Sequence, residues 1–207
     1  MTKISERGMI FNAEMVRALL DGRKTQTRRP IKWKQTRFTE IGEREDGSKW
    51  PWSEDAKHAC DFWHPCPFDA VGDRIWVREA FRVHSRATDV ATLVYKASER
   101  NSWTEQTRRV PVAVCNKPAT PEKWTPSLHM PRWASRILLE ITGVRVERLR
   151  SMSQDDARAE GVIAASGPME AGLAFRELWD SIYGEESWKA NPWVWVIEFK
   201  RVEGGAA

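Results

Sequence analysis

Apolar and polar residues alternate along several short segments of the chain, and this period-two pattern predicts β-strands. The segment GDRIWVREAFRV at 72–83 has the strongest strand pattern. The segment at 136–150 predicts a long bent strand or a hairpin that pivots at Gly143. Pro30 lacks a backbone N–H, which confines the end of its strand to a sheet edge. The remaining predicted strands are RGMIF, KTQTRRPI, ATLVYKAS, VPVAVCN and WVWVIEFKRV.

Three segments instead place apolar residues at helical spacing. The first follows Asn12, which can cap a helix N-terminus, and it ends at Gly22. The second begins at Ser153, with Asp156 placed as the acid of a capping box. The third covers residues 168–184. Because strands dominate and helices interrupt them, the predicted class is α+β, a small and mostly antiparallel β-barrel with flanking helices.

Residues 32–65 differ in composition from the segments around them, with few aliphatic residues, many charges and several tryptophans. Within this stretch, Asp46-Gly47 is a signal for a type I′ hairpin turn between two strands. We therefore predict a single domain over 1–207, with 32–65 as a Trp-rich inserted hairpin or loop region. The barrel itself is expected to be built from 8–31, 71–116 and 136–202.

Composition excludes several classes of protein. Of the 207 residues, 41% are hydrophobic, which is enough for a packed core and argues against wholesale disorder. No apolar run approaches the roughly 18 residues of a membrane span, and the N-terminus lacks a signal-peptide core. Three cysteines are an odd number that does not fit a secreted disulfide scaffold. We expect a soluble, cytoplasmic protein without a membrane partner.

Charge is concentrated near the N-terminus. The net charge is only +4, but residues 1–37 contain ten Lys or Arg and three acidic residues, and four of these cations lie in DGRKTQTRRP at 21–30. Such a local excess is typical of a phosphate-binding surface, and it is also common on ordinary solvated surfaces. The twelve tryptophans could stack bases, although most are expected to pack in the core or the insertion.

The motif Gly22-x-Lys24-x-x-Thr27-x-Arg29 resembles the signature of the ASCH (activating signal cointegrator homology) family, small barrels similar to the PUA RNA-binding fold. That family usually has glutamate where Thr27 stands. With threonine, the segment is similar to the bacterial ASCH amidohydrolases that cleave N(4)-acetylcytidine, which also have a glutamate in a short helix, here Glu160. The resemblance covers 8–31, 71–83 and 136–202. In its length the chain is more similar to long ASCH proteins that are often encoded in prophages.

The resemblance implies an amidohydrolase that acts on an acylated cytidine or a related modified nucleoside, without a cofactor, with Lys24, Thr27 and Glu160 as catalytic residues. Amide hydrolysis needs a nucleophile, a base that activates it and an acid for the departing amine. A threonine hydroxyl is inert at neutral pH without a base, and a lysine is a base only where its surroundings keep it neutral. A carboxylate such as that of Glu160, at the negative end of a helix, favours its protonated form, which suits a general acid.

Six further residues are candidates for substrate binding. Arg23, Arg28 and Arg29 would lower the pKa of Lys24 through like charge and stabilise an oxyanion. The proline-punctuated segment PSLHMPRW contributes His129, Arg132 and Trp133, of which the last two could hold a phosphate and a base. The alternative for this segment is a loop that merely covers one end of the barrel.

Two alternatives remain open on the sequence. The first is a non-catalytic RNA-binding PUA-like module whose basic residues hold phosphates. The second is a zinc site in HACDFWHPC, which contains His58, Cys60, His64 and Cys66. Their spacing matches none of the usual patterns of two separated knuckles, and Cys66 equally fits a buried thiol at a strand entry, so no metal is predicted. The sequence predicts no oligomeric state.

Overall fold

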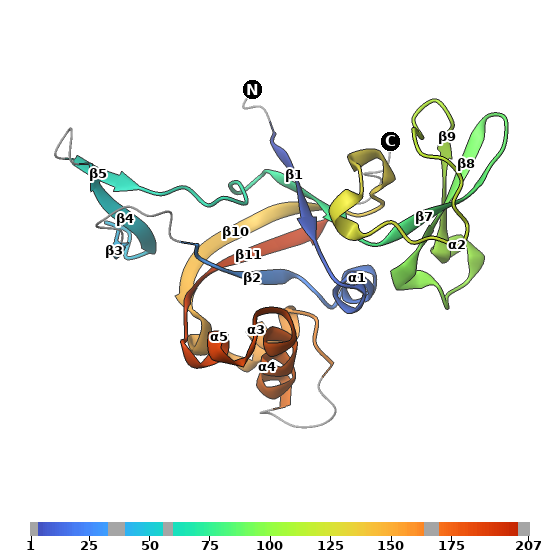
Figure 1. The fold of residues 1–207 in the computed structure, drawn as a ribbon. Coiled ribbons are helices and arrows are strands. Elements are labelled where there is room, and N and C mark those ends of the chain that lie inside the picture. Colours follow the sequence, from blue (N-terminus) through green and yellow to red (C-terminus); the bar gives the residue numbers. More distant parts are fainter. Residues whose placement is uncertain (1–3, 33–39, 56–59, 164–169, 203–207) are drawn as a thin grey trace. The chain divides into compact units, whose positions relative to one another are not determined.

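The computed structural model describes residues 4–32, 40–55, 60–163 and 170–202. Within them, eleven strands lie in three sheets, and there are five α-helices (Figure 1). The predicted α+β class is therefore confirmed. The chain divides into two compact units. The first comprises 1–22, 74–140 and 201–207, and the second comprises 23–73 and 141–200.

The largest sheet has five strands in the order β1-β6-β10-β11-β2. β1 pairs with β6 in parallel, β6 pairs with residues 138–140 of β10 in antiparallel, and β11 pairs with β2 in antiparallel. β2 is an edge strand, as Pro30 predicted. The bounds are β1 (Glu6–Ile10), β6 (Arg74–Arg78), β10 (Leu138–Arg148), β11 (Trp193–Arg201) and β2 (Gln26–Pro30).

None of the sheets formed by the described residues closes into the predicted barrel. Two segments that the prediction gave to the barrel wall form β8 (Val90–Tyr95) and β9 (Thr107–Pro111), which pair with β7 (Phe81–Arg86) in a separate three-stranded sheet. The predicted strand VPVAVCN (110–116) begins three residues too late, because β9 starts at Thr107 and residues 112–114 form a turn after Pro111. The residues between the predicted strands ATLVYKAS and VPVAVCN contain α2 (Trp103–Gln106) and most of β9.

The single strand predicted at 72–83 is wrong as well, because it is two strands, β6 and β7, that belong to different sheets. Glu79 lies between them and is buried. Its two carboxylate oxygens accept hydrogen bonds from Nε and Nη2 of Arg136 at 2.8 and 2.9 Å. A buried carboxylate needs such a partner, and this bidentate pair fixes the chain where it leaves one sheet for the other.

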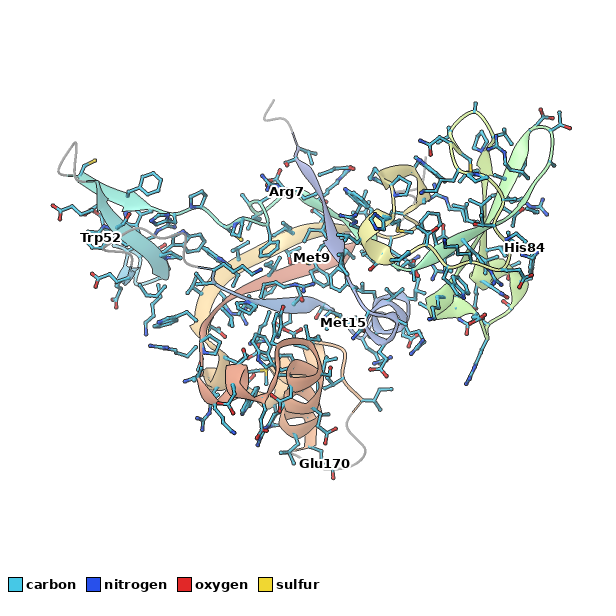
Figure 2. The ribbon with its side chains drawn as sticks, viewed as in Figure 1. Arg7, Met9, Met15, Trp52, His84 and Glu170 are labelled. Atoms are coloured by element: carbon cyan, nitrogen blue, oxygen red, sulfur yellow. The ribbon has the colours of Figure 1, made fainter. Side chains whose placement is uncertain are left out.

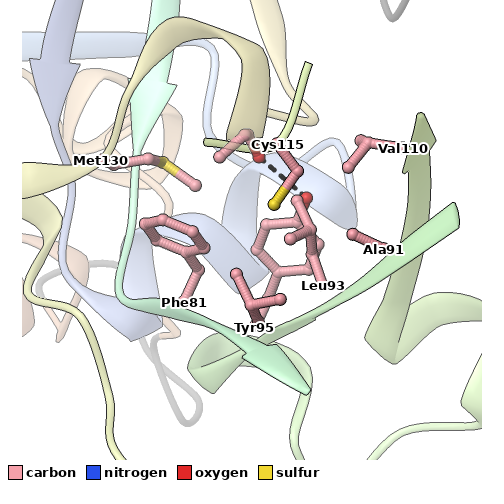
Figure 3. Packing of buried hydrophobic residues seen from close by; sticks show 9 residues of the cluster. Phe81, Ala91, Leu93, Tyr95, Val110, Cys115 and Met130 are labelled. Carbon is pink, nitrogen blue, oxygen red and sulfur yellow. Dashed lines mark hydrogen bonds between the residues drawn. The ribbon is translucent and has the colours of Figure 1, made fainter. Parts of the chain in front are cut away.

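In the first unit, one face of the β7–β8–β9 sheet packs a hydrophobic core (Figure 3). Tyr95 lies in this core and its hydroxyl donates to the carbonyl oxygen of Ala134 at 2.8 Å. The core consists of Phe81, Val83, Ala91, Leu93, Tyr95, Val110, Cys115, Met130 and Ala134.

Helix α1 (Ala13–Leu20) has the predicted ends, since Asn12 accepts a hydrogen bond from the Met15 N–H at 2.8 Å and Gly22 has a φ of +73°.

In the second unit, α3 (Gln154–Ala159), α4 (Glu170–Tyr183) and the unpredicted α5 (Glu185–Lys189) accompany β10, β11 and β2 (Figure 1). β10 is one continuous strand through Gly143, where a Cβ atom would lie only 2.8 Å from Glu198 Oε2. The capping box of α3 is confirmed. The core of this unit consists of Leu149, Ala157, Ala171, Phe175, Trp179, Val194 and Val196.

The second unit also contains a three-stranded sheet of β3 (Glu40–Glu43), β4 (Lys49–Asp55) and β5 (Cys60–Trp63), which lies within the segment predicted as an insertion. The hairpin at Asp46-Gly47 is confirmed, but its turn is not type I′, because Gly47 has a positive φ and Asp46 does not. Trp50 of β4 contacts Trp195 of β11 edge to face, with ring centroids 5.0 Å apart. The organisation as one domain with an insertion stays a prediction.

Candidate functional site

Lys24 and Glu160, 136 residues apart in the sequence, form a buried ion pair in the second unit. Lys24 Nζ donates to Glu160 Oε2 at 2.8 Å and to the Glu160 main-chain oxygen at 2.9 Å. Lys24 lies two residues before β2, and Glu160 caps the C-terminus of α3. The N–H of Thr25 donates to the carbonyl oxygen of Ala159 at 2.8 Å, which joins the start of β2 to the end of α3. Lys24 is only 3% exposed and Glu160 only 2%.

Arg28 is the second cation at this site, and its side chain is completely buried. Its Nη1 lies 3.2 Å from Glu160 Oε1, while its Nη2 lies 3.3 Å from Glu147 Oε2 and 3.4 Å from Asp156 Oδ1. Arg28 Nε has no hydrogen-bond partner among the described residues. A buried donor without a partner is costly, so this atom is suited to an acceptor supplied by water or a ligand.

Burial lowers the pKa of the Lys24 amine, because a charged amine loses its hydration in the protein interior. Glu160 opposes this shift, whereas the charges of Arg29 and Arg28 add to it. The lowering of the Lys24 pKa by like charge, predicted from the sequence, is therefore present, but burial lowers this pKa more. Arg23 instead donates from Nη1 to the carbonyl oxygen of Gly161 at 2.6 Å.

A network of carboxylates surrounds the pair and was not predicted from the sequence. Arg145 on β10 lies 2.6 Å from Glu147 and 2.9 Å from Asp156, and it also contacts Glu198. Gln26 Nε2 donates to the main-chain oxygen of Asp156 at 2.8 Å and to its Oδ1 at 3.1 Å. Arg145 and Glu147 stand two apart on a strand, a spacing that puts both on one sheet face and that could have indicated a polar cluster.

Thr27 stands apart from this cluster. β2 pairs with β11 so that Thr27 lies opposite Ile197, whereas Arg28 lies opposite Val196 and Gln26 opposite Glu198. Because successive side chains of a strand point to opposite faces, Thr27 is on the other face of β2 from Gln26 and Arg28. Thr27 is also buried, at 2% exposure. The structure thus brings Lys24, Arg28 and Glu160 together and directs Thr27 to the opposite side of the strand.

The basic residues of segment 21–30 do not form the solvated phosphate-binding surface that their sequence suggested. Lys24 and Arg28 are buried against carboxylates. Arg29 Nη1 donates to the Tyr183 hydroxyl at 3.4 Å. Two of the four basic residues, Lys24 and Arg28, therefore pair with acidic groups of β10, α3 and the C-cap of α3.

The other three predicted binding residues belong to the first unit and make their contacts there. His129 is exposed at the end of a short 3₁₀-helix. Arg132 Nε donates to Glu6 Oε2 at 2.9 Å. Trp133 contacts Phe81 edge to face, with ring centroids 6.3 Å apart, and packs against the core. These contacts are structural, and their role in binding stays a prediction.

No group of three or more potential metal ligands is assembled in the part of the chain that the structure describes. His58 lies outside the described residues. Cys60 is exposed and Cys66 is half-buried, so Cys66 is less buried than the alternative of a buried thiol predicted. His64 Nε2 lies 2.9 Å from Ser53 Oγ.

We expect Asp156 to stabilise the second unit in a pH-dependent manner. Burial raises the pKa of Asp156, but hydrogen bonds from Ser153 and Gln26 and the charge of Arg28 outweigh it, so its pKa is well below the ordinary value. A carboxyl group with a depressed folded-state pKa contributes stability above its unfolded pKa of about 3.9, and this contribution is lost as the pH falls through the folded value. Wild-type unfolding free energy, measured with urea, should therefore fall more steeply with acidification than that of Asp156→Asn.

Asp155→Asn is the matched control for this measurement. Asp155 lies on the same helix, pairs with Arg158 and is 93% exposed. Its replacement should leave the wild-type pH dependence unchanged. A wild-type curve that coincides with that of Asp156→Asn throughout the acid range would contradict the assignment.

The helices of the described residues include none that is long and apolar enough to cross a membrane. No family model matches the chain, and no curated protein or solved structure matches it either. The relation to the ASCH family therefore stays a prediction that rests on the motif residues.

Proposed function

We propose that the chain is an ASCH-type amidohydrolase that cleaves the amide bond of an acylated cytidine or a related modified nucleoside. The observation that carries the proposal is the buried, hydrogen-bonded pair of Lys24 and Glu160, in which the pKa of the lysine is lowered. A titratable pair with a perturbed pKa is the usual chemistry of a proton-transfer site. The sequence motif supplies the substrate class.

Lys24 and Glu160 form a pair in which the lysine can act as a base and the carboxyl group can pass on a proton. Burial moves the Lys24 amine toward its neutral form, which can accept a proton from an attacking hydroxyl or water. As the attacking oxygen bonds to the acyl carbon, the C–N bond breaks and the exocyclic nitrogen of the base takes up a proton. Glu160 Oε2, 2.8 Å from Lys24 Nζ, is placed to relay it.

In this proposal, the role of Arg28 is supported by its contacts, whereas that of Thr27 is supported only by the motif. Arg28 holds the second oxygen of Glu160 at 3.2 Å and keeps Nε available for an acceptor, which fits stabilisation of an oxyanion. Thr27 as the nucleophile rests on the motif, because the strand register directs it away from Arg28. A water molecule activated by Lys24 is the nucleophile that this geometry supports better.

The rival proposal is a non-catalytic RNA-binding module that uses the same basic segment. Phosphate contacts require accessible cations. Lys24 and Arg28 are buried in ion pairs instead, which disfavours phosphate contacts by these two residues.

The direct test is to incubate the purified protein with N(4)-acetylcytidine and a panel of other acylated nucleosides and to separate the products by chromatography. We expect release of the free nucleoside and the carboxylic acid. Heat-denatured protein provides the background rate. A folded wild-type protein that produces nothing above this background from any member of the panel would contradict the proposal.

A further inference from the structure

The β7–β8–β9 sheet of the first unit has a second face, opposite to its core. Phe81 and Val83 of β7 point into the core, so Arg82 between them points to the other side. The strand register extends this outer face across the sheet, because Arg82 lies opposite Val94 and Thr92 lies opposite Arg109. We call it the outer face. It carries Arg82, Thr92, Val94 and Arg109, of which Arg109 is exposed, Arg82 and Thr92 are half-buried and Val94 is buried.

The charge of this sheet has one sign. Its three strands contain four arginines and no aspartate or glutamate. Arg108 and Arg86 use their guanidinium groups on main-chain oxygens of the unit, those of Ser135 and Lys117 among them. Arg82 and Arg109 remain for the outer face, and Arg109 is exposed. The outer face is therefore suited to an anion.

Two tryptophans accompany these arginines. The Arg82 guanidinium lies 4.4 Å from the ring centroid of Trp124, a cation–π contact. Trp103 is 52% exposed and contacts His84 edge to face, with ring centroids 5.8 Å apart (Figure 2 labels His84). The Thr107 hydroxyl, which lies opposite Val94 in the strand register, donates to the Trp103 carbonyl oxygen at 2.7 Å, so Trp103 lies at an end of the outer face. Its exposed indole offers a flat surface on which a planar ring can stack.

Two buried side-chain nitrogen atoms of strand β7, Arg82 Nε and His84 Nδ1, have no hydrogen-bond partner among the described residues. The Arg82 guanidinium packs on the face of the Trp124 ring. His84 lies at the irregularity between Val83 and Ser85, where the strand register shifts. A guanidinium N–H can only donate, so Arg82 Nε is suited to an oxygen acceptor from a ligand.

We propose that the outer face binds single-stranded nucleic acid, with a base stacked on Trp103 and phosphates bound by Arg82 and Arg109. Phosphates complement a sheet that has only positive charge. A base can stack on a protein ring only when it is unstacked from its neighbours, which selects a single strand over a duplex. All of these residues lie in the first unit, and binding needs no turnover, so the outcome is independent of the amide-hydrolysis proposal.

The test is fluorescence anisotropy with a labelled oligouridylate of about twelve nucleotides at about 50 mM salt and above. Trp103→Ala should weaken binding about tenfold through lost stacking, and Trp103→Phe should retain most of the affinity. The double variant Arg82→Ala/Arg109→Ala should reduce the slope of log affinity against log salt by about 0.7 per arginine removed. Arg158→Ala, which removes an exposed arginine of the second unit, is the matched control and should bind as the wild type does.

Three results would overturn the proposal. The first is a wild type that does not bind the oligouridylate at low salt. The second is equal affinity of the wild type and Trp103→Ala for the oligouridylate, which would indicate charge attraction without stacking. The third is binding of a duplex of the same length as tightly as the single strand.

Discussion

Glu160→Ala is expected to lower the free energy of unfolding by about 4 kcal/mol, because it leaves two buried cations without their shared carboxylate. Glu160 accepts from Lys24 at 2.8 Å and from Arg28 at 3.2 Å, and all three side chains are buried. Removing one partner of a buried ion pair exposes the full desolvation cost of the other. Urea unfolding followed by circular dichroism measures the difference.

The exposed pair of Arg158 and Asp155, on the helix that Glu160 caps, is the matched control for this prediction. Breaking it with Asp155→Ala should cost less than about 1 kcal/mol, since solvent screens both charges. The double variant Lys24→Met/Glu160→Leu should recover much of the stability lost in Glu160→Ala, because it removes one buried cation along with the anion. Equal losses in Glu160→Ala and Asp155→Ala would show that the buried pair has no special weight.

Lys24→Ala is expected to reduce the rate of hydrolysis of an acylated nucleoside by about 10³-fold, the range of general acid–base catalysis. The variant should stay folded, because Glu160 keeps its contact with Arg28. Lys24→Arg should be similarly inactive, since a guanidinium stays protonated and cannot act as a base. Lys189→Ala, at an exposed position of α5, should retain full activity.

The pH dependence of the rate provides a second readout for Lys24. Burial lowers the pKa of this amine, so its neutral, active form appears as the pH rises through the folded value, below the ordinary lysine pKa of about 10.4. The wild-type rate should therefore rise with pH over a range where an exposed lysine stays protonated. A Lys24→Ala variant with wild-type turnover, or a rate independent of pH, would rule Lys24 out as the base.

The local signals of the sequence predicted the helix ends well. Asn12 and Ser153 cap helices because their side-chain oxygens satisfy nearby N–H groups, which needs no information from elsewhere in the chain. Pro30 predicted an edge strand for an equally local reason.

The sequence did not predict which distant segments pair with each other. The division of 72–83 into two strands depends on Arg136, which lies 57 residues after Glu79. The barrel prediction failed for the same kind of reason, because alternation identifies a strand but not the sheet that it joins.

At the candidate site, the motif indicated Lys24 and Glu160, and the structure places them in contact. The roles of Glu147 and Asp156 as partners of Arg28 were missed, because a cation gives no sign in the sequence of which carboxylates it will meet. Thr27 shows the opposite limit. Spacing within a motif counts residues along the chain, whereas the face of the strand on which a side chain lies depends on backbone conformation.

Asp156 connects the first turn of α3 with strand β2, because one carboxylate both closes the capping box with Ser153 and contacts Gln26 and Arg28. A helix of six residues does not persist in water by itself, so α3 depends on its contacts with β2, β10 and α4. Glu160 sits at the far end of that short helix. Local fraying of α3 and loss of the Lys24–Glu160 pair are consequently one cooperative opening, so the pair exists only while α3 is folded.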